Sequence, residues 1–180
     1  PEHAGPPTAN DVNTVNRYAV FQVAVQRNYS ELISRCPRVV YLTNPVNMRR
    51  FSTVTPARDC LVAEWNGNAL HKAGHSYIKH FRDVIIPACQ SAGVPLVAAE
   101  YNTKGGDHRR RDPAEMPGFY QQASVALCAS EFEAASNSVL EGMASGLAVI
   151  ATDCGNHREM RDSQIKAYGD TGILITEGTV

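Results

Sequence analysis

The chain of 180 residues has no apolar run near the roughly 20 residues that a membrane-spanning helix needs. Its 17 basic and 18 acidic residues leave a formal net charge of −1, so nothing electrostatic favours nucleic acid or an acidic membrane as the main partner. Neither a Gly-x-Gly-x-x-Gly nor a Walker sequence is present, which counts against a dinucleotide oxidoreductase and an ATPase. The length indicates one ordinary domain with an ample core.

Few residues are suited to cross-linking or to binding metals. The cysteines are five, an odd number, widely spaced and mostly within apolar segments: Cys36, Cys60, Cys89, Cys128 and Cys154. This pattern predicts reduced core thiols in a cytoplasmic protein, not a disulfide framework or a zinc site. His71 and His75 are four residues apart, but no third ligand follows at a convincing spacing, so we expect no metal site. No signal peptide is visible, although a start at Pro1 suggests that the true N-terminus is missing.

Short apolar runs recur along the chain, and most gaps between them can hold a helix. The expected strands are Val39–Leu42, Cys60–Ala63, Pro95–Ala98, Val125–Cys128, Ala148–Ala151 and Ile173–Ile175. Apolar residues at helical spacing predict one helix within Val12–Ile33 and another over Tyr77–Cys89, the second closed by Gly93. Alternating strands and helices predict an α/β fold with a Rossmann-like, doubly wound parallel sheet. We expect an N-terminal segment and helix over residues 1–38, followed by a ligand-binding domain over residues 39–180.

The segment after the Val125–Cys128 run carries the most chemistry. Glu133 and Glu141 are separated by seven residues, with a helix expected between Ser136–Ser138 and Gly146, because Ser and Asn begin helices and Gly ends them. The free N–H groups of that helix's first turn would bind anions or sugar oxygens. Carboxylates accept hydrogen bonds from paired hydroxyls. The segment therefore predicts a site for a phosphorylated sugar or a nucleotide sugar.

A second candidate loop runs from Trp65 to Gly74 and is expected to follow a strand and precede a helix. Gly67 would let the backbone approach a phosphate, and Lys72 could pair with the phosphate charge. Ligands of parallel sheets bind beyond the carboxyl ends of the strands, where both this loop and Glu133 are expected.

Residues 133–159 also resemble a known signature. Glu133, Glu141, the Met143–Ala144 pair, Gly146, the Val149–Ile150 strand and Gly155 with the later Glu159 look like the donor-binding motif of the retaining GT-B glycosyltransferases of family 4, group 1. Asp170–Ile175 is similar to a later strand of that family, and Leu42–Asn47 resembles the segment that opens its C-terminal domain. The resemblance extends from about Val39 to Ile175.

That resemblance implies the C-terminal, donor-binding half of a GT-B fold. Such an enzyme transfers a sugar from a nucleotide-diphosphate sugar with retention of configuration and needs no metal or other cofactor. By the same resemblance, Glu141 would hold the ribose hydroxyls and Glu133 the hydroxyls of the transferred sugar. The amides near Ser136, Asn137 and Ser138 would bind sugar and phosphate oxygens, and Lys72 would stabilise the leaving diphosphate. Gly67 would lie beside the diphosphate, and Asn102 would lie near the base.

The chain departs from the family at one important position and in its extent. Asn68 stands where the family has an arginine that binds the diphosphate, and an Asn cannot supply a cationic fork. Another cation could replace it, for example Arg109, Arg110 or Arg111, although such a run is typical of a solvated surface. A non-catalytic, degenerate domain therefore remains an alternative, as does a non-transferase sugar-nucleotide enzyme such as an epimerase.

The family has a second, N-terminal domain that binds the acceptor, and further helices at its C-terminal end. We expect both to be missing from this chain, together with any peripheral membrane association that the missing half would bring. The chain alone is therefore expected to bind a nucleotide sugar weakly and to transfer nothing.

Overall fold

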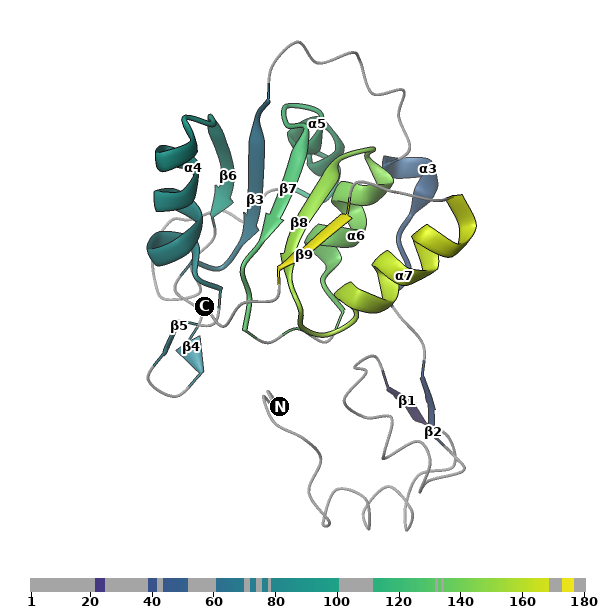
Figure 1. The fold of residues 1–180 in the computed structure, drawn as a ribbon. Coiled ribbons are helices and arrows are strands. Elements are labelled where there is room, and N and C mark those ends of the chain that lie inside the picture. The colour runs from purple at the N-terminus through teal and green to yellow at the C-terminus, as the bar shows by residue number, and fades with distance from the viewer. Residues whose placement is uncertain are drawn as a thin grey trace.

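A parallel β-sheet forms the centre of the computed structural model (Figure 1). The structure describes residues 22–24, 39–41, 44–51, 61–69, 72–73, 76–77, 79–100, 112–131, 133, 135–168 and 173–176. The sheet strands are β3 (Ala63–Gly67), β6 (Leu96–Glu100), β7 (Val125–Cys128), β8 (Ala148–Thr152) and β9 (Ile173–Thr176). Their order is β6-β3-β7-β8-β9, and every neighbouring pair is parallel.

The order of these strands reverses at β3. The chain passes from β3 to β6 on one side and later returns to place β7 on the other side of β3. In open α/β sheets such a reversal opens a crevice between the carboxyl ends of the two strands that lead away from it. The topology therefore places the expected ligand site between the ends of β3 and β7.

Helices cover both faces of the sheet (Figure 1). A π-helical turn, η2 (Phe81–Ile85), continues into α4 (Ile86–Ala92) between β3 and β6. The helices α5 (Met116–Tyr120), α6 (Asn137–Ala144) and α7 (His157–Tyr168) connect the strands from β6 to β9, and α3 (Met48–Phe51) contacts α6. Crossovers between parallel strands are right-handed, so reversing the direction of travel along the sheet moves the connecting helices to the opposite face.

Each face has its own hydrophobic core. Trp65 stacks on Phe81 with ring centroids 4.0 Å apart beneath η2, and Ile85 and Cys89 join the same cluster. The cluster on the other face is built on fully buried aromatic and aliphatic side chains of α5, α6 and the sheet: Phe119, Tyr120, Ala126, Val139 and Val149. Successive side chains of a strand point to opposite faces, which explains why neighbouring β7 residues belong to different clusters.

The sheet confirms the predicted α/β fold with a Rossmann-like arrangement. The runs predicted as strands at Val125–Cys128, Ala148–Ala151 and Ile173–Ile175 are β7, β8 and β9, and Pro95–Ala98 overlaps β6. Val39–Leu42 overlaps β2 (Val39–Tyr41), but this strand pairs with β1 (Gln22–Ala24) in a separate two-stranded sheet.

The helix predicted within Val12–Ile33 is wrong over its described residues. Gln22–Ala24 form β1, which runs parallel to β2. Backbone pairing with β2 supplies the hydrogen bonds there, and the valine-rich sequence is compatible with a strand.

The strand predicted at Cys60–Ala63 lies too early in the sequence. Val62 instead precedes β3, where its N–H donates to Ser124 Oγ at 2.9 Å. The strand runs from Ala63 to Gly67 and pairs with β6 along its whole length. Polar Glu64 and Asn66 within the strand interrupt the apolar pattern, which is why the sequence did not reveal it.

The helix predicted over Tyr77–Cys89 is present, but Lys72–Ala73 (β4) and Ser76–Tyr77 (β5) form an antiparallel pair before it, which the sequence did not predict. Helical structure begins at Phe81 instead of Tyr77. It ends at Ala92, as expected, and Gly93 follows with a left-handed φ of 63°.

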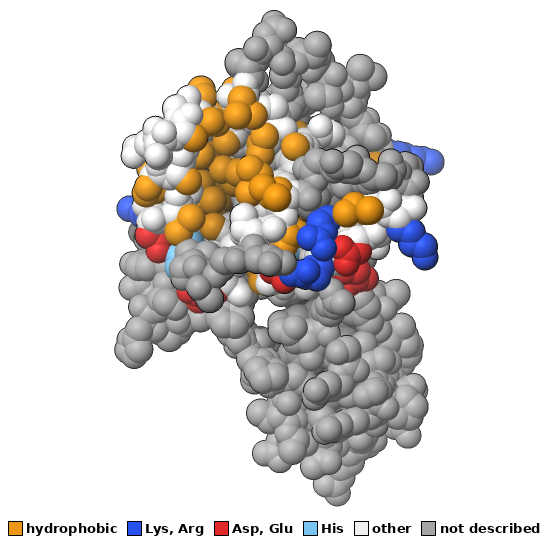
Figure 2. Space-filling view, viewed as in Figure 1, with side chains coloured by type: hydrophobic (Ala, Val, Ile, Leu, Met, Phe, Trp, Pro, Cys, Tyr) orange, Lys and Arg blue, Asp and Glu red, His pale blue; other side chains and the backbone are white. Residues whose placement is uncertain are grey.

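One area of the surface is apolar (Figure 2). Hydrophobic side chains of β3, β7, β8 and α4 line a cavity of about 510 Å³ on the face of the sheet that carries α4. Ile150 and its neighbour in register, Leu174, are 39% and 58% exposed. Among the described residues, no helix has the length and apolar character needed to cross a membrane.

Candidate functional site

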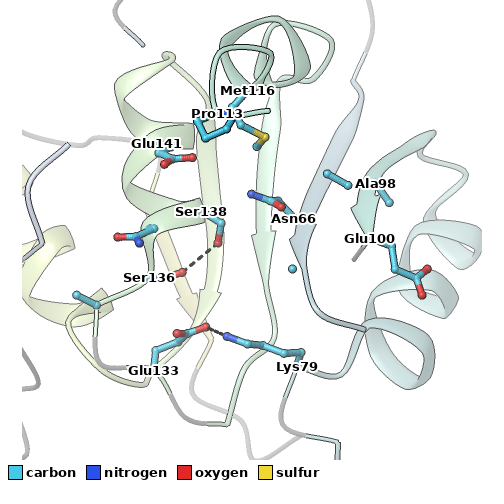
Figure 3. A pocket seen from close by; sticks show the side chains of 14 residues that line it. Asn66, Lys79, Ala98, Glu100, Pro113, Met116, Glu133, Ser136, Ser138 and Glu141 are labelled. Atoms are coloured by element: carbon cyan, nitrogen blue, oxygen red, sulfur yellow. Dashed lines mark hydrogen bonds and ion pairs between the residues drawn. The ribbon is translucent and has the colours of Figure 1, made fainter. Parts of the chain in front are cut away.

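A polar cavity of about 500 Å³ lies at the reversal of the sheet (Figure 3). Most of its wall consists of residues that follow β7, begin α6 or lie at the carboxyl ends of β3 and β6. The lining residues are Asn66, Gly67, Lys79, Ala98, Ala99, Glu100, Pro113, Met116, Glu133, Ala135, Ser136, Asn137, Ser138 and Glu141. Its position agrees with the crevice that the topology predicts.

Glu133 is held at the lower end of this cavity by two contacts. Its Oε1 accepts a hydrogen bond from Ser130 Oγ at 2.9 Å and forms an ion pair with Lys79 Nζ. The Lys79 and Glu133 side chains are only 21% and 14% exposed, so solvent screens this pair less than it screens a surface salt bridge. The cavity therefore holds a carboxylate and a cation side by side.

The N-terminus of α6 forms the adjacent wall. Ser136 is the N-cap with an extended backbone, and its Oγ lies 3.1 Å from Ser138 Oγ. Asn44 supports this turn from outside, donating from Nδ2 to the Ala135 carbonyl at 3.1 Å and to Asn137 Oδ1 at 2.9 Å. The free amides of a first helical turn attract anions and sugar oxygens. The predicted helix start and the predicted stop near Gly146 are both confirmed.

Glu141 lies one turn further along α6 and is oriented by a buried tyrosine. Its Oε2 accepts a hydrogen bond from the Tyr120 hydroxyl at 3.0 Å, and Asn66 Nδ2 donates to the same hydroxyl at 3.3 Å. Burial, with Glu64 and Glu141 nearby, raises the pKa of Tyr120, so the phenol keeps its proton and remains a donor. Strands and helices distant in sequence thus fix one oxygen of Glu141.

A second carboxyl group lies under α6. Glu64 is 1% exposed, and its Oε2 has no hydrogen-bond partner among the described residues. Burial raises its pKa well above the usual range, and the nearby Cys128 and Glu141 act in the same direction. Its other oxygen lies 3.7 Å from where a side chain at Gly142 would begin, so α6 packs closely on β3.

The second predicted loop is only partly at the cavity. Gly67 lines the cavity, but it ends a strand instead of lying in a loop, and a Cβ there would come within 3.0 Å of the Trp65 ring. Asn68 is buried and is not among the residues that line the cavity. Lys72 lies in β4, and its side chain is outside the described part of the structure. Asn102 and Arg109–Arg111 are outside the described residues.

Three side chains at the site were missed by the sequence analysis: Lys79, Asn66 and Tyr120. Lys79 lies two residues before the helical segment that begins at Phe81, and a lysine between a strand and a helix is a recognisable signal. Asn66 and Tyr120 carry no such signal, because only the pairing of β3 with β7 brings them to Glu141. In the described part of the chain, no group of three or more His, Cys, Asp or Glu side chains could hold a metal ion.

Comparisons with known proteins agree with this class of fold. Residues 106–180 match the family model described as "Glycosyl transferases group 1". No curated protein sequence matches the chain significantly. Among solved structures, a glycosyltransferase from Rickettsia africae ESF-5 has a TM-score of 0.66 and 13% sequence identity, covering 98% of this chain and 55% of that one.

A second solved structure is the lipopolysaccharide outer core galactosyltransferase WaaB in its apo form, with a TM-score of 0.49 and 17% identity, covering 76% of this chain and 44% of that one. The chain thus spans about half the length of the solved structures it matches. The Rickettsia structure shows that the fold is that of a GT-B glycosyltransferase half.

Proposed function

We propose that this chain is the donor-binding half of a retaining glycosyltransferase of family 4, acting on a nucleotide-diphosphate sugar. One observation carries the proposal: Glu133, Glu141, the N-terminus of α6 and Lys79 line a single polar cavity at the reversal of the sheet. This combination offers acceptors for sugar hydroxyls together with donors and positive charge for a diphosphate.

A nucleotide sugar would lie along the cavity with its parts matched to these groups. The ribose hydroxyls would donate to the carboxylate of Glu141, one of whose oxygens accepts a hydrogen bond from Tyr120. The diphosphate would accept from the first-turn amides at Ser136–Ser138 and from Lys79, and the transferred sugar would donate to Glu133. The base would occupy the upper part, beside Asn66, Ala98 and Met116.

In the proposed reaction the bond from the anomeric carbon to the diphosphate oxygen breaks, and negative charge develops on the departing diphosphate. The acceptor's hydroxyl oxygen bonds to the anomeric carbon, and its proton passes to the departing diphosphate. The first-turn amides of α6 are fixed by the helix, so they would stabilise this charge without reorganising. Lys79 must turn from Glu133 towards the diphosphate, and the bound sugar hydroxyls replace it at the carboxylate. The scheme has no metal-dependent step and no resident cofactor.

The acceptor and its binding surface are assigned to another domain, because the chain spans about half of the structures it matches. Any contact of the whole protein with a membrane would come through that half. We propose a cytoplasmic location, where nucleotide sugars are available to the site, and no role for nucleic acid.

A degenerate, non-catalytic domain is the main alternative, and Asn68 is the residue that favours it, since the expected arginine is missing. Lys79 argues for an active site instead, because it supplies a cation within the cavity. A sugar-nucleotide epimerase would bind the same donor but would change the sugar without an acceptor.

The first experiment is ligand-observed NMR of the 180-residue chain with UDP, GDP, ADP and their sugars. We expect selective binding of one base, lost in Glu141→Ala because the ribose loses its acceptor. Glu115→Ala is the matched control, since Glu115 is exposed and outside the cavity, and it should bind like the wild type. Absence of binding to every nucleotide, or equal binding by Glu141→Ala, would contradict the proposed site.

A further inference from the structure

His80 lies next to the proposed site and contacts carboxylates through both ring nitrogens. Its Nδ1 lies 2.7 Å from Asp83 Oδ2, at the start of the helical segment, and its Nε2 lies 2.9 Å from Glu131 Oε1, after β7. The residue is 7% exposed. An imidazole can donate from both nitrogens only when it is protonated, so this geometry fits the imidazolium form.

The backbone at His80 is also unusual. His80 has φ 46° and ψ 35°, and it is the sole non-glycine residue with positive φ in the described part of the chain. That conformation is costly for most side chains, and surrounding contacts must maintain it. The two carboxylate contacts help to hold the residue in this position, together with the hydrogen bonds that its carbonyl accepts from the Val84 and Ile85 N–H groups.

The contact with Glu131 joins the same two segments as the Lys79–Glu133 ion pair. Lys79 and His80 are consecutive residues before η2, whereas Glu131 and Glu133 are two apart after β7. A left-handed residue sets the direction in which the chain leaves it, and therefore the direction of the residue before it. The orientation of Lys79 thus depends on whether His80 keeps its contacts.

We propose that His80 is a positioning residue of the nucleotide-sugar site, which aims Lys79 into the cavity by tying the start of η2 to the loop after β7. The inference rests on the proposed function and adds a residue to it that does not line the cavity. The proposed role of His80 also makes the site sensitive to pH, because its contact with Glu131 depends on the charge of the imidazole.

The charges around His80 set the direction of this sensitivity. Asp83 on η2 and Glu131 after β7 face the imidazole directly, while Lys79 is paired with Glu133, and Arg82 with Glu100. Burial alone would lower the pKa of His80, but the hydrogen bonds and charges of Asp83 and Glu131 raise it above its ordinary value. The charged contact between His80 and Glu131 is therefore fully formed below about pH 6.5 and weakens as the pH rises through the raised pKa of His80.

The test compares four forms of the 180-residue chain: wild type, His80→Asn, Glu131→Gln and Asp83→Asn. Asparagine tolerates the left-handed backbone, so His80→Asn removes the charge and the contact with Glu131 without adding backbone strain of its own. Asp83→Asn is the matched control, because it changes one carboxylate partner and leaves the contact between the two segments.

Affinity for UDP, GDP and ADP is measured calorimetrically at pH 6 and pH 9. At pH 6 we expect His80→Asn and Glu131→Gln to bind about fivefold more weakly than the wild type, and Asp83→Asn to match it. Wild-type affinity should fall towards the His80→Asn value at pH 9. Titration of the phosphates is common to all four proteins and cancels in the comparison.

Two NMR measurements on the ligand-free proteins separate this inference from the proposed function. The His80 ring should titrate above its ordinary pKa in the wild type and lower in Glu131→Gln. Cross-peaks between the Lys79 ε-methylene and the Glu133 γ-methylene should be present in the wild type and in Asp83→Asn, and lost in His80→Asn.

Failure of every nucleotide to bind the wild type would overturn the proposed function, and the two NMR measurements would still decide the role of His80. Nucleotide binding with the same affinity and pH profile in wild type and His80→Asn would overturn the positioning role alone. So would Lys79–Glu133 cross-peaks that persist in His80→Asn.

Discussion

At the scale of single residues, two lysines are candidates for one role. The resemblance assigns the diphosphate cation to Lys72, whereas the ion pair with Glu133 places Lys79 at the cavity. The two lie seven residues apart: Lys72 begins β4, whereas Lys79 follows β5. An alignment by spacing cannot distinguish them, because the path of the intervening hairpin decides which lysine reaches the site.

Lys79→Met should weaken binding of the selected nucleoside diphosphate by tenfold or more, since a hydrogen bond to a charged group contributes about 1.5–3 kcal/mol. Lys72→Met should have a smaller effect. Titration calorimetry measures both, with the matching nucleoside as control, because its affinity does not involve the phosphates. A larger loss in Lys72→Met would show that the assignment from the resemblance was right and that from the cavity wrong.

Glu64 is expected to make the stability of the chain depend on pH. Its pKa is raised in the folded chain by burial, so the folded state binds more protons than the unfolded state above about pH 4.3. Stability from this group is therefore complete at low pH and falls as the pH rises towards the raised pKa. The carboxylate form is the one that folding disfavours.

Glu64→Gln should consequently raise the melting temperature, and the gain should be larger at pH 8 than at pH 5. Thermal unfolding at both pH values, followed by circular dichroism, measures the difference. Glu115→Gln is the control, because Glu115 is exposed and should show no such dependence. An equal gain at pH 5 and pH 8 would show that Glu64 does not titrate differently on folding.

At the scale of elements, α6 connects the site to the sheet. The helix begins at the predicted capping residues and places Glu141 towards the cavity, while Val139 and Gly142 face the sheet. A side chain at Gly142 would start 3.0 Å from Ala126 Cβ, a distance that requires the helix or β7 to move. This glycine therefore permits the close approach that brings Glu141 to Tyr120.

Gly142→Ala should destabilise the chain by about 1–3 kcal/mol, as overpacking commonly does, although alanine favours a helix more than glycine. Gly118→Ala is the matched control in α5, because nothing lies within 4 Å of its Cβ position. It should be neutral or stabilise by up to about 1 kcal/mol. Urea unfolding compares the two, and similar effects would mean that α6 can move without cost.

Other elements show where local sequence stops being informative. Gly93 and the runs of β7, β8 and β9 were predictable, because helix stops and buried parallel strands depend on neighbouring residues. β3 and β1 were not. Glu64 and Asn66 are polar residues within a central strand, and three residues of a predicted helix pair with β2 instead. Long-range pairing outweighs local preference in both cases.

At the scale of the whole molecule, the cavity forms only one side of the complete active site that we propose. A cavity at the carboxyl ends of β3 and β7 can hold a donor, but transfer requires an acceptor oxygen within about 3–3.5 Å of the anomeric carbon. In our proposal a second domain supplies that proximity.

The 180-residue chain should therefore bind its nucleotide sugar and transfer nothing. The assay incubates the chain with the selected donor and simple sugar or lipid acceptors, and mass spectrometry detects products. Binding in the same sample provides the control for a folded site. Transfer by the chain alone would contradict the division of roles between two domains, and a changed donor sugar without acceptor would favour an epimerase.

The sequence by itself determined the α/β class, most strands of the main sheet, the start and end of α6, and the pair of glutamates. These features depend on capping, on glycine conformation and on apolar periodicity, all of which act over a few neighbouring residues. Only the tertiary structure decided that Lys79 is the cation beside Glu133, that Tyr120 and Asn66 orient Glu141, and that Asn68 lies outside the cavity wall. Those relations depend on the crossing of the chain at β3, which brings residues more than 50 positions apart within hydrogen-bonding distance.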